Sequence, residues 1–164
     1  MARIPMLEFA SVLDIPGFEG AGQLHCLSVY DSDQPGVTAL RPGDVRWVRF
    51  VEGVPRGAEE SAYGKAATGK DGADPWPPPG IRTRILGEAP VERDGSFFVN
   101  IVGNTPFYMQ ILDGDYVSLH TMRSWTWVRS GSQRGCIGCH ENKELSPQNR
   151  ATDALMKMEP TLVG

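Results

Sequence analysis

Four short apolar segments between residues 81 and 121, each followed by a turn signal, constrain the fold of this chain most. They cover 81–91, 96–102, 106–112 and 116–121. The residues that divide them include Asp94-Gly95, Gly103-Asn104 and Asp113-Gly114, which favour hairpin turns. This spacing predicts an antiparallel meander of four strands.

Two further strands are predicted nearer the N-terminus, over 24–30 and 44–52. In the second, alternation places one set of side chains, Val45, Trp47, Arg49 and Val51, opposite Val48 and Phe50. Helix signals are confined to 136–145 and 150–158. The expected fold is therefore mainly β, an antiparallel β-sandwich or open barrel of six or seven strands with short C-terminal helices.

The 164 residues fit one domain with one hydrophobic core. We expect a lead-in segment over 1–23, where no hydrophobic period is sustained, and a single β-rich domain over 24–164. Within it, residues 53–80 are rich in Gly and Pro and predict a long surface loop. This loop is either a disordered excursion or a flap over a cofactor or partner.

Composition and charge exclude several classes of protein. The net charge is -4 and no run of Lys or Arg exists, so nucleic acid is not an expected partner. No stretch of about 18 apolar residues is present, which argues against a membrane span. The first ten residues do not resemble a secretory signal. A location outside the cytoplasm, in the periplasm or beyond the cell, therefore requires a signal that is absent from this chain.

The sequence Cys136-Ile137-Gly138-Cys139-His140 is the Cys-x-x-Cys-His pattern of c-type haem attachment. Two residues three apart on a helical turn project from one face, so two sulfurs can reach two vinyl groups of a porphyrin. The next residue, a histidine, is a usual ligand of haem iron. We therefore expect the C-terminal helices to carry one covalently bound haem c, with His140 as its proximal iron ligand.

Three other interpretations of these cysteines remain open. A zinc site could combine Cys26 with Cys136, Cys139 and His140, although adjacent residues rarely bind one tetrahedral ion together. A thiol–disulfide redox pair normally opens a helix after a strand in a βαβ unit, and no such unit precedes Cys136. A structural disulfide is the third. Outside these cases, Cys26 is most simply a small buried residue.

The iron ligand opposite His140 is not fixed by the sequence. The histidines and methionines that could occupy this position are His25, His120, Met122 and Met156, with Met109 and Met158 as further candidates. An open position is an equal alternative. Two strong ligands favour electron transfer, whereas an open site permits binding or chemistry at the iron.

Aromatic and basic residues precede the cysteine motif. Trp125 and Trp127 are predicted to pack on the haem, and Arg123, with Arg129 and Arg134 as alternatives, to pair with its propionates. Each of these residues also has an ordinary interpretation, because Trp in a strand is usually core and Arg near a turn is usually solvated. No catalytic residue is assigned.

Several segments together resemble the haem-bearing middle domain of the hydrazine synthase alpha subunit and related bacterial c-type cytochrome domains. They are 28–32, 46–55 (RWVRFVEGVP), 85–98 (ILGEAPVERDGSFF), 122–127 (MRSWTW) and 134–141 (RGCIGCHE). The resemblance implies one module of a longer protein, in which a tyrosine one helical turn after the motif histidine binds the iron. Here that position is Glu144, and no tyrosine follows Tyr116, which returns the proximal role to His140.

The sequence thus favours an extracytoplasmic electron-transfer domain with one haem, working with other redox proteins or cytochrome subunits in a larger complex. The alternative is an enzyme or sensor related to the hydrazine synthase alpha subunit, in which five-coordinate haem binds a small molecule. A third hypothesis is a zinc-binding or purely structural β module without haem.

Overall fold

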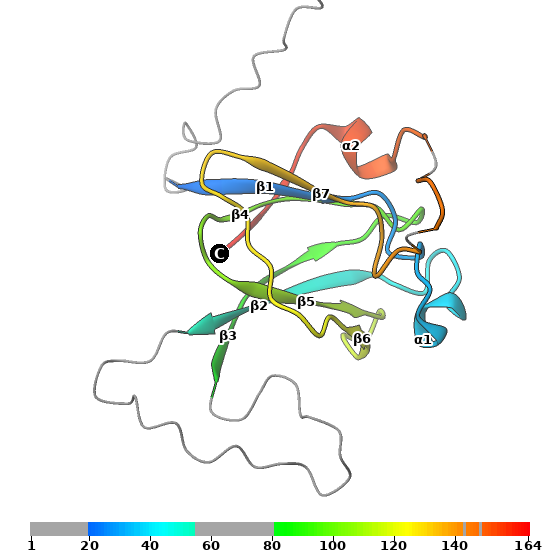
Figure 1. Ribbon diagram of the computed structural model, residues 1–164, viewed down its shortest axis with the longest axis horizontal. Coiled ribbons are helices and arrows are strands. Elements are labelled where there is room, and N and C mark those ends of the chain that lie inside the picture. Colours follow the sequence, from blue (N-terminus) through cyan, green and yellow to red (C-terminus); the bar gives the residue numbers. More distant parts are fainter. Residues whose placement is uncertain (1–19, 55–80, 143, 148) are drawn as a thin grey trace, which may run out of the picture.

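The computed structural model describes residues 20–54, 81–142, 144–147 and 149–164, and in this part of the chain eight strands form two four-stranded sheets (Figure 1). The β1 sheet has the order β7-β1-β4-β8. Its strands are β1 (Ala21–Cys26), β4 (Phe97–Val102), β7 (Gln133–Cys136) and β8 (Thr161–Val163). β1 and β4 are antiparallel, while β7 runs parallel to β1 and β8 parallel to β4.

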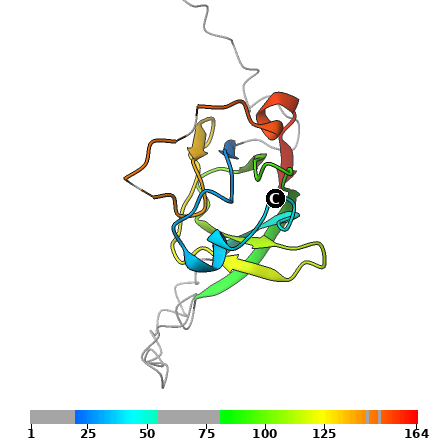
Figure 2. The same cartoon turned by 90° about the vertical axis from the view of Figure 1, so that its right-hand side faces the viewer.

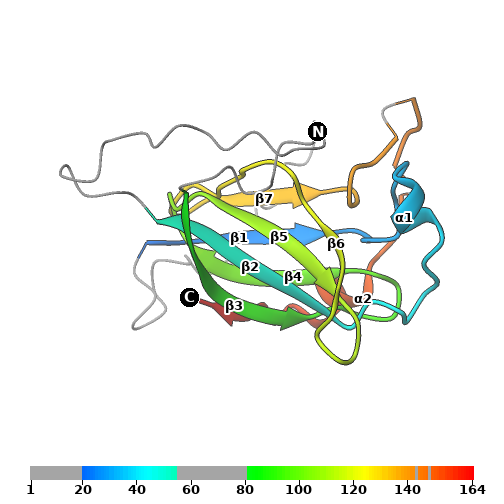
Figure 3. The same ribbon diagram turned by 90° about the horizontal axis from the view of Figure 1, so that it is seen from below.

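The β2 sheet has the order β3-β2-β5-β6, and all its neighbours are antiparallel. Its strands are β2 (Trp47–Val54), β3 (Arg82–Pro90), β5 (Phe107–Leu112) and β6 (Ser118–Thr121). Figure 1 shows the β1 sheet above the β2 sheet, and Figure 3 shows their strands from below. The two open sheets make the fold a sandwich rather than a closed barrel, as the sequence allowed.

The hydrophobic core lies between the two sheets. Leu24, Val99 and Ile101 of the β1 sheet are fully buried, as are Val48 and Phe50 of the β2 sheet. The Phe50 ring contacts the rings of Phe97 and Phe107 edge to face, with centroids 6.1 and 5.6 Å apart. The contact between Phe50 and Phe97 joins the two sheets. Fully burying one such side chain contributes about 1.5–3 kcal/mol to stability.

The mainly β fold is confirmed, and six strands lie near their predicted positions. The meander is wrong, because β3 pairs with β2 whereas β4 pairs with β1, so the chain crosses between sheets at residues 91–96. Turn residues show where a chain changes direction but not which strand it then meets. Of the three turns predicted between residues 81 and 121, the turn at 113–117 is the one that joins neighbouring strands, β5 and β6.

The alternation predicted for the second strand holds for part of its length. Val48 and Phe50 are buried, and Trp47 and Arg49 are partly exposed on the other face. Val51 is also buried, but it lies outside the core cluster and pairs with the buried Tyr108 of β5 on the outer face of the sheet. The register shift lies on the β3 side, where Leu86 is an extra residue, and the pairing of β2 with β5 stays regular. Val45, predicted on the same side as Trp47, lies instead in the core cluster just before β2 begins.

Of the two predicted C-terminal helices, one is present and one is not. A short helix, α2 (Asp153–Lys157), lies within 150–158, and α1 (Pro35–Thr38) was not predicted. The helix over 136–145 is wrong, because Cys136 ends β7 and residues 137–140 form bends. Pairing of β7 with β1 satisfies its backbone groups in the sheet, so the cysteine motif lies on a strand end and not on a helix.

Figure 2 looks at the end of the sandwich that carries α1 and shows the segment after β7 passing from α1 towards α2. Most of the predicted lead-in 1–23 and of the loop 53–80 lies outside the described residues; the remainder belongs largely to β1 and β2. The single-domain organisation stays a prediction. Among the described residues, no helix has the length and apolar character needed to cross a membrane.

Candidate functional site

The Cys136–His140 segment is held by the chain that leaves β1. Cys136 pairs with Cys26 in parallel register. Beyond the strands, the N–H groups of Leu27 and Ser28 donate to the carbonyl oxygens of Cys136 and Ile137 at 2.9 and 3.1 Å. The backbone conformation at Cys136 and Ile137 is therefore fixed by hydrogen bonds to residues more than 100 positions away in sequence.

Gly138 is enclosed by the same segment. A Cβ atom at this position would lie 2.0 Å from the carbonyl oxygen of Asp31, far inside van der Waals contact. Because the obstructing atom belongs to the backbone, a larger residue could be accommodated only by moving one segment away from the other. The second intervening position of the motif is therefore restricted to glycine by packing.

The three cysteines of the chain gather at one margin of the core, and none is in a disulfide. Cys26 is buried, while Cys136 and Cys139 are partly buried and pack against the core cluster. Burial and the neighbouring Cys136 raise the pKa of Cys139 to about 11. Burial also raises the pKa of Cys136 and that of Cys26. Reactive redox thiols require a lowered pKa, so this environment does not support a thiol–disulfide enzyme.

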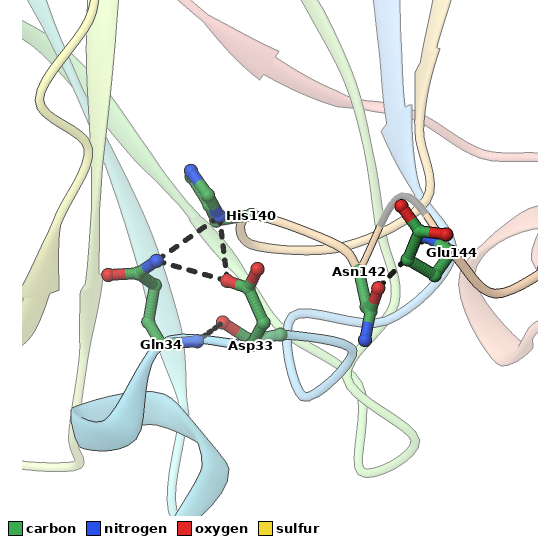
Figure 4. Close-up of polar contacts among 6 residues, drawn as sticks. Asp33, Gln34, His140, Asn142 and Glu144 are labelled. Carbon is green, nitrogen blue, oxygen red and sulfur yellow. Dashed lines mark hydrogen bonds and ion pairs between the residues drawn. The ribbon is translucent and has the colours of Figure 1, made fainter.

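His140 points out of the sandwich, with 61% of its side chain exposed, and meets Asp33 (Figure 4). Its Nδ1 lies 2.8 Å from Oδ1 of Asp33, and the side-chain amide of Gln34 donates to the same oxygen at 3.0 Å. Hydrogen bonds from Gln34 and then from His140 hold the pKa of Asp33 below its ordinary value. Nε2 of Gln34 also lies 3.2 Å from Nδ1. Because a carboxylate only accepts, the shorter contact with Asp33 assigns the proton to Nδ1.

In a neutral imidazole protonated at Nδ1, the other nitrogen, Nε2, carries the lone pair that can bind a metal. Figure 4 shows this second nitrogen on the far side of the ring from Asp33 and Gln34. The backbone of His140 is in the left-handed region, with φ of 66°, which is uncommon for a residue other than glycine. The N–H of Asp33 donates to the carbonyl oxygen of His140 at 3.1 Å and supports this conformation.

Asp33 and Gln34 are site residues that sequence reasoning missed. They lie in a polar stretch just before α1, where no site was predicted. No periodicity or motif connects this stretch to His140, which is 107 residues away from Asp33. The pairing of β1 with β7 brings the two segments together, and that pairing was not predicted.

His25 lies beside the motif but on the other face of the β1 sheet. It pairs in register with Gly135, where a Cβ atom would be 2.6 Å from its Nε2. Because side chains alternate along a strand, His25 projects away from the face on which Cys26 packs into the core. Its Nδ1 is buried without a hydrogen bond, and burial lowers its pKa. This orientation is unfavourable for an iron ligand that shares a haem with Cys136.

His120, by contrast, comes from the β2 sheet towards His140. It lies on β6 and pairs with the buried Ile111 of β5. Its pKa is lowered by burial and then by electrostatic interaction with His140. Met122 directly follows β6, and its N–H donates to the carbonyl oxygen of Met109 at 2.9 Å. Met109 packs against the core.

Met156 lies on α2, and Met158 ends this helix; both side chains are largely exposed. α2 is attached to the turn between β3 and β4, where Lys157 contacts Glu92 and the N–H of Ala154 donates to Oγ of Ser96.

Comparison with known proteins identifies the family. The family model described as the hydrazine synthase alpha subunit middle domain matches residues 43–141, which include the whole Cys136–His140 segment. The chain belongs to this family.

Two relatives from Kuenenia stuttgartiensis agree with this assignment. Hydrazine synthase subunit alpha is 41% identical over 56 residues, which are 34% of this chain and 7% of that protein. The solved structure of Kuenenia stuttgartiensis hydrazine synthase has a TM-score of 0.64 and 25% identity, covering 84% of this chain and 20% of that one. The chain thus corresponds to a small part of these larger proteins.

Glu144 occupies the position where the resemblance to the hydrazine synthase alpha subunit implies a tyrosine. Its N–H donates to Oδ1 of Asn142 at 2.9 Å, within a short turn after the motif. Figure 4 shows its side chain well apart from the imidazole of His140. Where the resemblance implies a phenol oxygen, this chain has a carboxylate, and His140 is the nitrogen donor next to Cys139 in sequence.

The tryptophans and arginines predicted around the motif occupy two different places. Trp125 packs on Gly53 and meets the Tyr108 ring edge to face, near the end of β2 that is remote from α1 (Figure 1). Trp127 is 55% exposed. The Arg134 guanidinium lies 6.0 Å from the Trp127 ring centre and donates to its carbonyl oxygen at 3.0 Å.

Arg123 and Arg129 are exposed on the same connection between β6 and β7. Trp127 and Arg134 therefore form a surface pair beside β7, while Trp125 belongs to the packing of the β2 sheet. Contact of these residues with a haem stays a prediction.

Among the described residues, no three His, Cys, Asp or Glu side chains are grouped closely enough to hold a metal ion. All four residues of the zinc alternative, Cys26, Cys136, Cys139 and His140, lie in that part of the chain. Their arrangement, with three sulfurs facing the core and the imidazole facing Asp33, does not support a tetrahedral site.

Proposed function

We propose that this chain is an extracytoplasmic c-type cytochrome domain with one haem, bonded through thioethers to Cys136 and Cys139 and bound at its iron by Nε2 of His140. One observation carries the proposal. The imidazole that follows two unpaired thiols has its Nδ1 engaged by Asp33 at 2.8 Å, so its lone pair lies on the opposite nitrogen.

The donor types present, two thiols and an imidazole, are those that such a group uses. A thioether is neutral, so it suits the partly buried margin of the core, where the thiols stay protonated. Aspartate behind a metal-binding histidine fixes the tautomer and orientation of the ring. When bound, the haem supplies exchange of one electron at its iron. The chain supplies attachment through the cysteines and orientation through His140.

For the second axial position, His120 is the strongest of the four candidates His120, Met122, Met156 and His25. It is partly buried, and on β6 it is paired with the buried Ile111, so its side chain lies on the face of the β2 sheet that meets the core. His25 projects from the other face of its strand, and Met156 belongs to a helix attached to residues 92–96. With His120 and His140 both bound, the domain would exchange electrons without binding a substrate at iron.

Membership in the hydrazine synthase alpha subunit middle domain family favours a second candidate function. In this alternative the iron has an open position and binds a small molecule, as an enzyme or sensor. The partners in either case would be other redox proteins or cytochrome subunits, because the curated relative is named as a subunit. The expected location is the periplasm or the cell exterior.

Attachment is tested by exporting the 164-residue chain to the periplasm of a host with a c-type haem assembly system. A pyridine haemochrome spectrum that persists after denaturation is expected for the wild type. Cys136→Ala should retain less haem than the wild type, and the double variant with Cys139→Ala should retain none covalently. Cys26→Ala is the matched control, because it removes the third neighbouring thiol and should keep the haem. Unmodified thiols in the matured wild type would overturn the proposal.

Coordination is tested with carbon monoxide on the reduced protein. Electron transfer with two protein ligands predicts slow or no binding in the wild type and rapid binding in His120→Ala. Met122→Ala is the comparison variant from the same connection. Rapid binding in the wild type would instead select the open-site alternative, and an unchanged spectrum in His140→Ala would remove His140 as a ligand.

A further inference from the structure

The geometry points to Asp33 as the positioning residue for the iron ligand: its carboxylate orients His140 and strengthens the ring as an electron donor, which lowers the reduction potential of the haem. This inference rests on the proposed function. It concerns a residue 107 positions before His140 and outside the haem motif. The residue touches the ligand and not the iron, so its role is indirect.

Both the backbone and the side chain of Asp33 engage His140. Its N–H donates to the His140 carbonyl oxygen at 3.1 Å, and its Oδ1 accepts from Nδ1 at 2.8 Å. The ring is thus fixed relative to its own main chain at two points. A left-handed residue with a largely exposed side chain would otherwise sample several rotamers.

The carboxylate is itself held in place. The side-chain amide of Gln34 donates to Oδ1 of Asp33 at 3.0 Å, and the N–H of Gln34 donates to Oγ of Ser32 at 3.1 Å. α1 begins at the next residue, Pro35, whose ring fixes the backbone there. The chain thus provides a short rigid segment, residues 32–35, that carries the acceptor for Nδ1.

A hydrogen bond from Nδ1–H to a carboxylate increases the basicity of the other ring nitrogen. A more basic ligand stabilises ferric iron more than ferrous iron, because the ferric ion carries the higher charge. Removing the negative charge while keeping the shape of the side chain should therefore raise the potential. Asp33→Asn makes this change, and Asp33→Glu keeps the charge.

The test measures haem potential by redox titration and the iron–histidine stretching band by resonance Raman spectroscopy, the latter in a reduced His120→Ala background. Asp33→Asn should keep full covalent haem and favour reduction about tenfold more than the wild type, equivalent to about 59 mV for one electron. Its iron–histidine band should move to lower frequency. Asp33→Glu should recover part of both changes.

Asp31→Asn is the matched control, because it removes one charge from the same segment. The N–H of Asp31 donates to the Ser28 carbonyl oxygen, and its own carbonyl oxygen faces Gly138. Equal potential shifts in the two variants with no Raman change would overturn the role of Asp33 and reduce it to one charge among others. Absence of covalent haem in the wild type would instead overturn the proposed function, so the two failures are distinguishable.

Discussion

Asp33 and Asp94 both join segments that are far apart in the sequence, but their carboxylates meet different kinds of partner. Oδ1 of Asp94 accepts from the N–H and Oγ of Ser96, and Oδ2 accepts from the N–H of Asp153 at the start of α2. These hydrogen-bond partners of Asp94 are backbone or hydroxyl groups that the fold has to satisfy, and the charge of Arg150 adds a smaller attraction. Asp33 meets an amide and an imidazole on an exposed surface.

From this difference we expect Asp94 to stabilise the fold and Asp33 to orient the His140 ring. Asp94 is partly buried, so its loss would leave the part-buried N–H and hydroxyl of Ser96 without an acceptor. Asp33 lies where water can replace each of its bonds, and exposed ion pairs of this kind add little to stability. What water cannot supply there is a fixed direction for the His140 ring. Substitutions at each segment can therefore test whether the two roles are separate.

The largest effect is expected from Gly138→Ala, which attacks the packing between the Asp33 segment and the cysteine motif. The new methyl group would lie 2.0 Å from the Asp31 carbonyl oxygen, and overpacking of this kind costs about 1–3 kcal/mol. Urea denaturation should show a lower midpoint. Gly36→Ala in α1 is the control, because a Cβ atom there meets nothing within 4 Å. Equal midpoints in the two variants would contradict the close packing.

Asp94→Ala is the next largest, with an expected loss of about 2 kcal/mol in the free energy of unfolding. The Ser96 hydroxyl and two backbone N–H groups would lose their acceptor, which costs more than removing both partners of a bond. The same urea experiment measures this loss, while covalent haem content should stay at the wild-type level. A variant as stable as the wild type would show that water replaces the carboxylate.

The advantage of the wild type over Asp94→Ala should also depend on pH. Burial alone would raise the pKa of Asp94, but hydrogen bonds from Ser96 and Asp153 outweigh burial and place it below its ordinary value. The ordinary value in the unfolded chain is about 3.9. The advantage is therefore complete above that pH and shrinks as the pH falls through the lower folded value. Denaturation between pH 7 and pH 2 measures it, and a constant difference would exclude the linkage.

The strands show how much of the fold the sequence could predict. Residues 96–102 and 106–112 have strong β patterns, and β4 and β5 lie within them. Their partners were not predictable from the Asp94-Gly95 and Gly103-Asn104 pairs, because pairing depends on which apolar faces meet in the core. β7 and β8 have four and three residues, too few for alternation to be recognised.

The residues of the candidate site also differ in whether the sequence could predict them. Cys136, Cys139 and His140 were predicted from local spacing alone, and their role stays a prediction. The helical turn on which that prediction placed them is a strand end followed by bends. Asp33 could not be found, because its contact with His140 follows from the parallel pairing of β1 with β7. The position of His120 likewise depends on how the two sheets face each other.

The smallest effect on stability, and the sharpest test of the comparison, is expected from Asp33→Ala. Its carboxylate is exposed and its partners can be hydrated, so the urea midpoint should match that of the wild type. Haem potential should nevertheless rise, as in Asp33→Asn, because the imidazole loses its acceptor at Nδ1. If Asp33→Ala lowers the midpoint as much as Asp94→Ala, both aspartates stabilise the fold. The orientation of His140 would then come from its left-handed backbone alone.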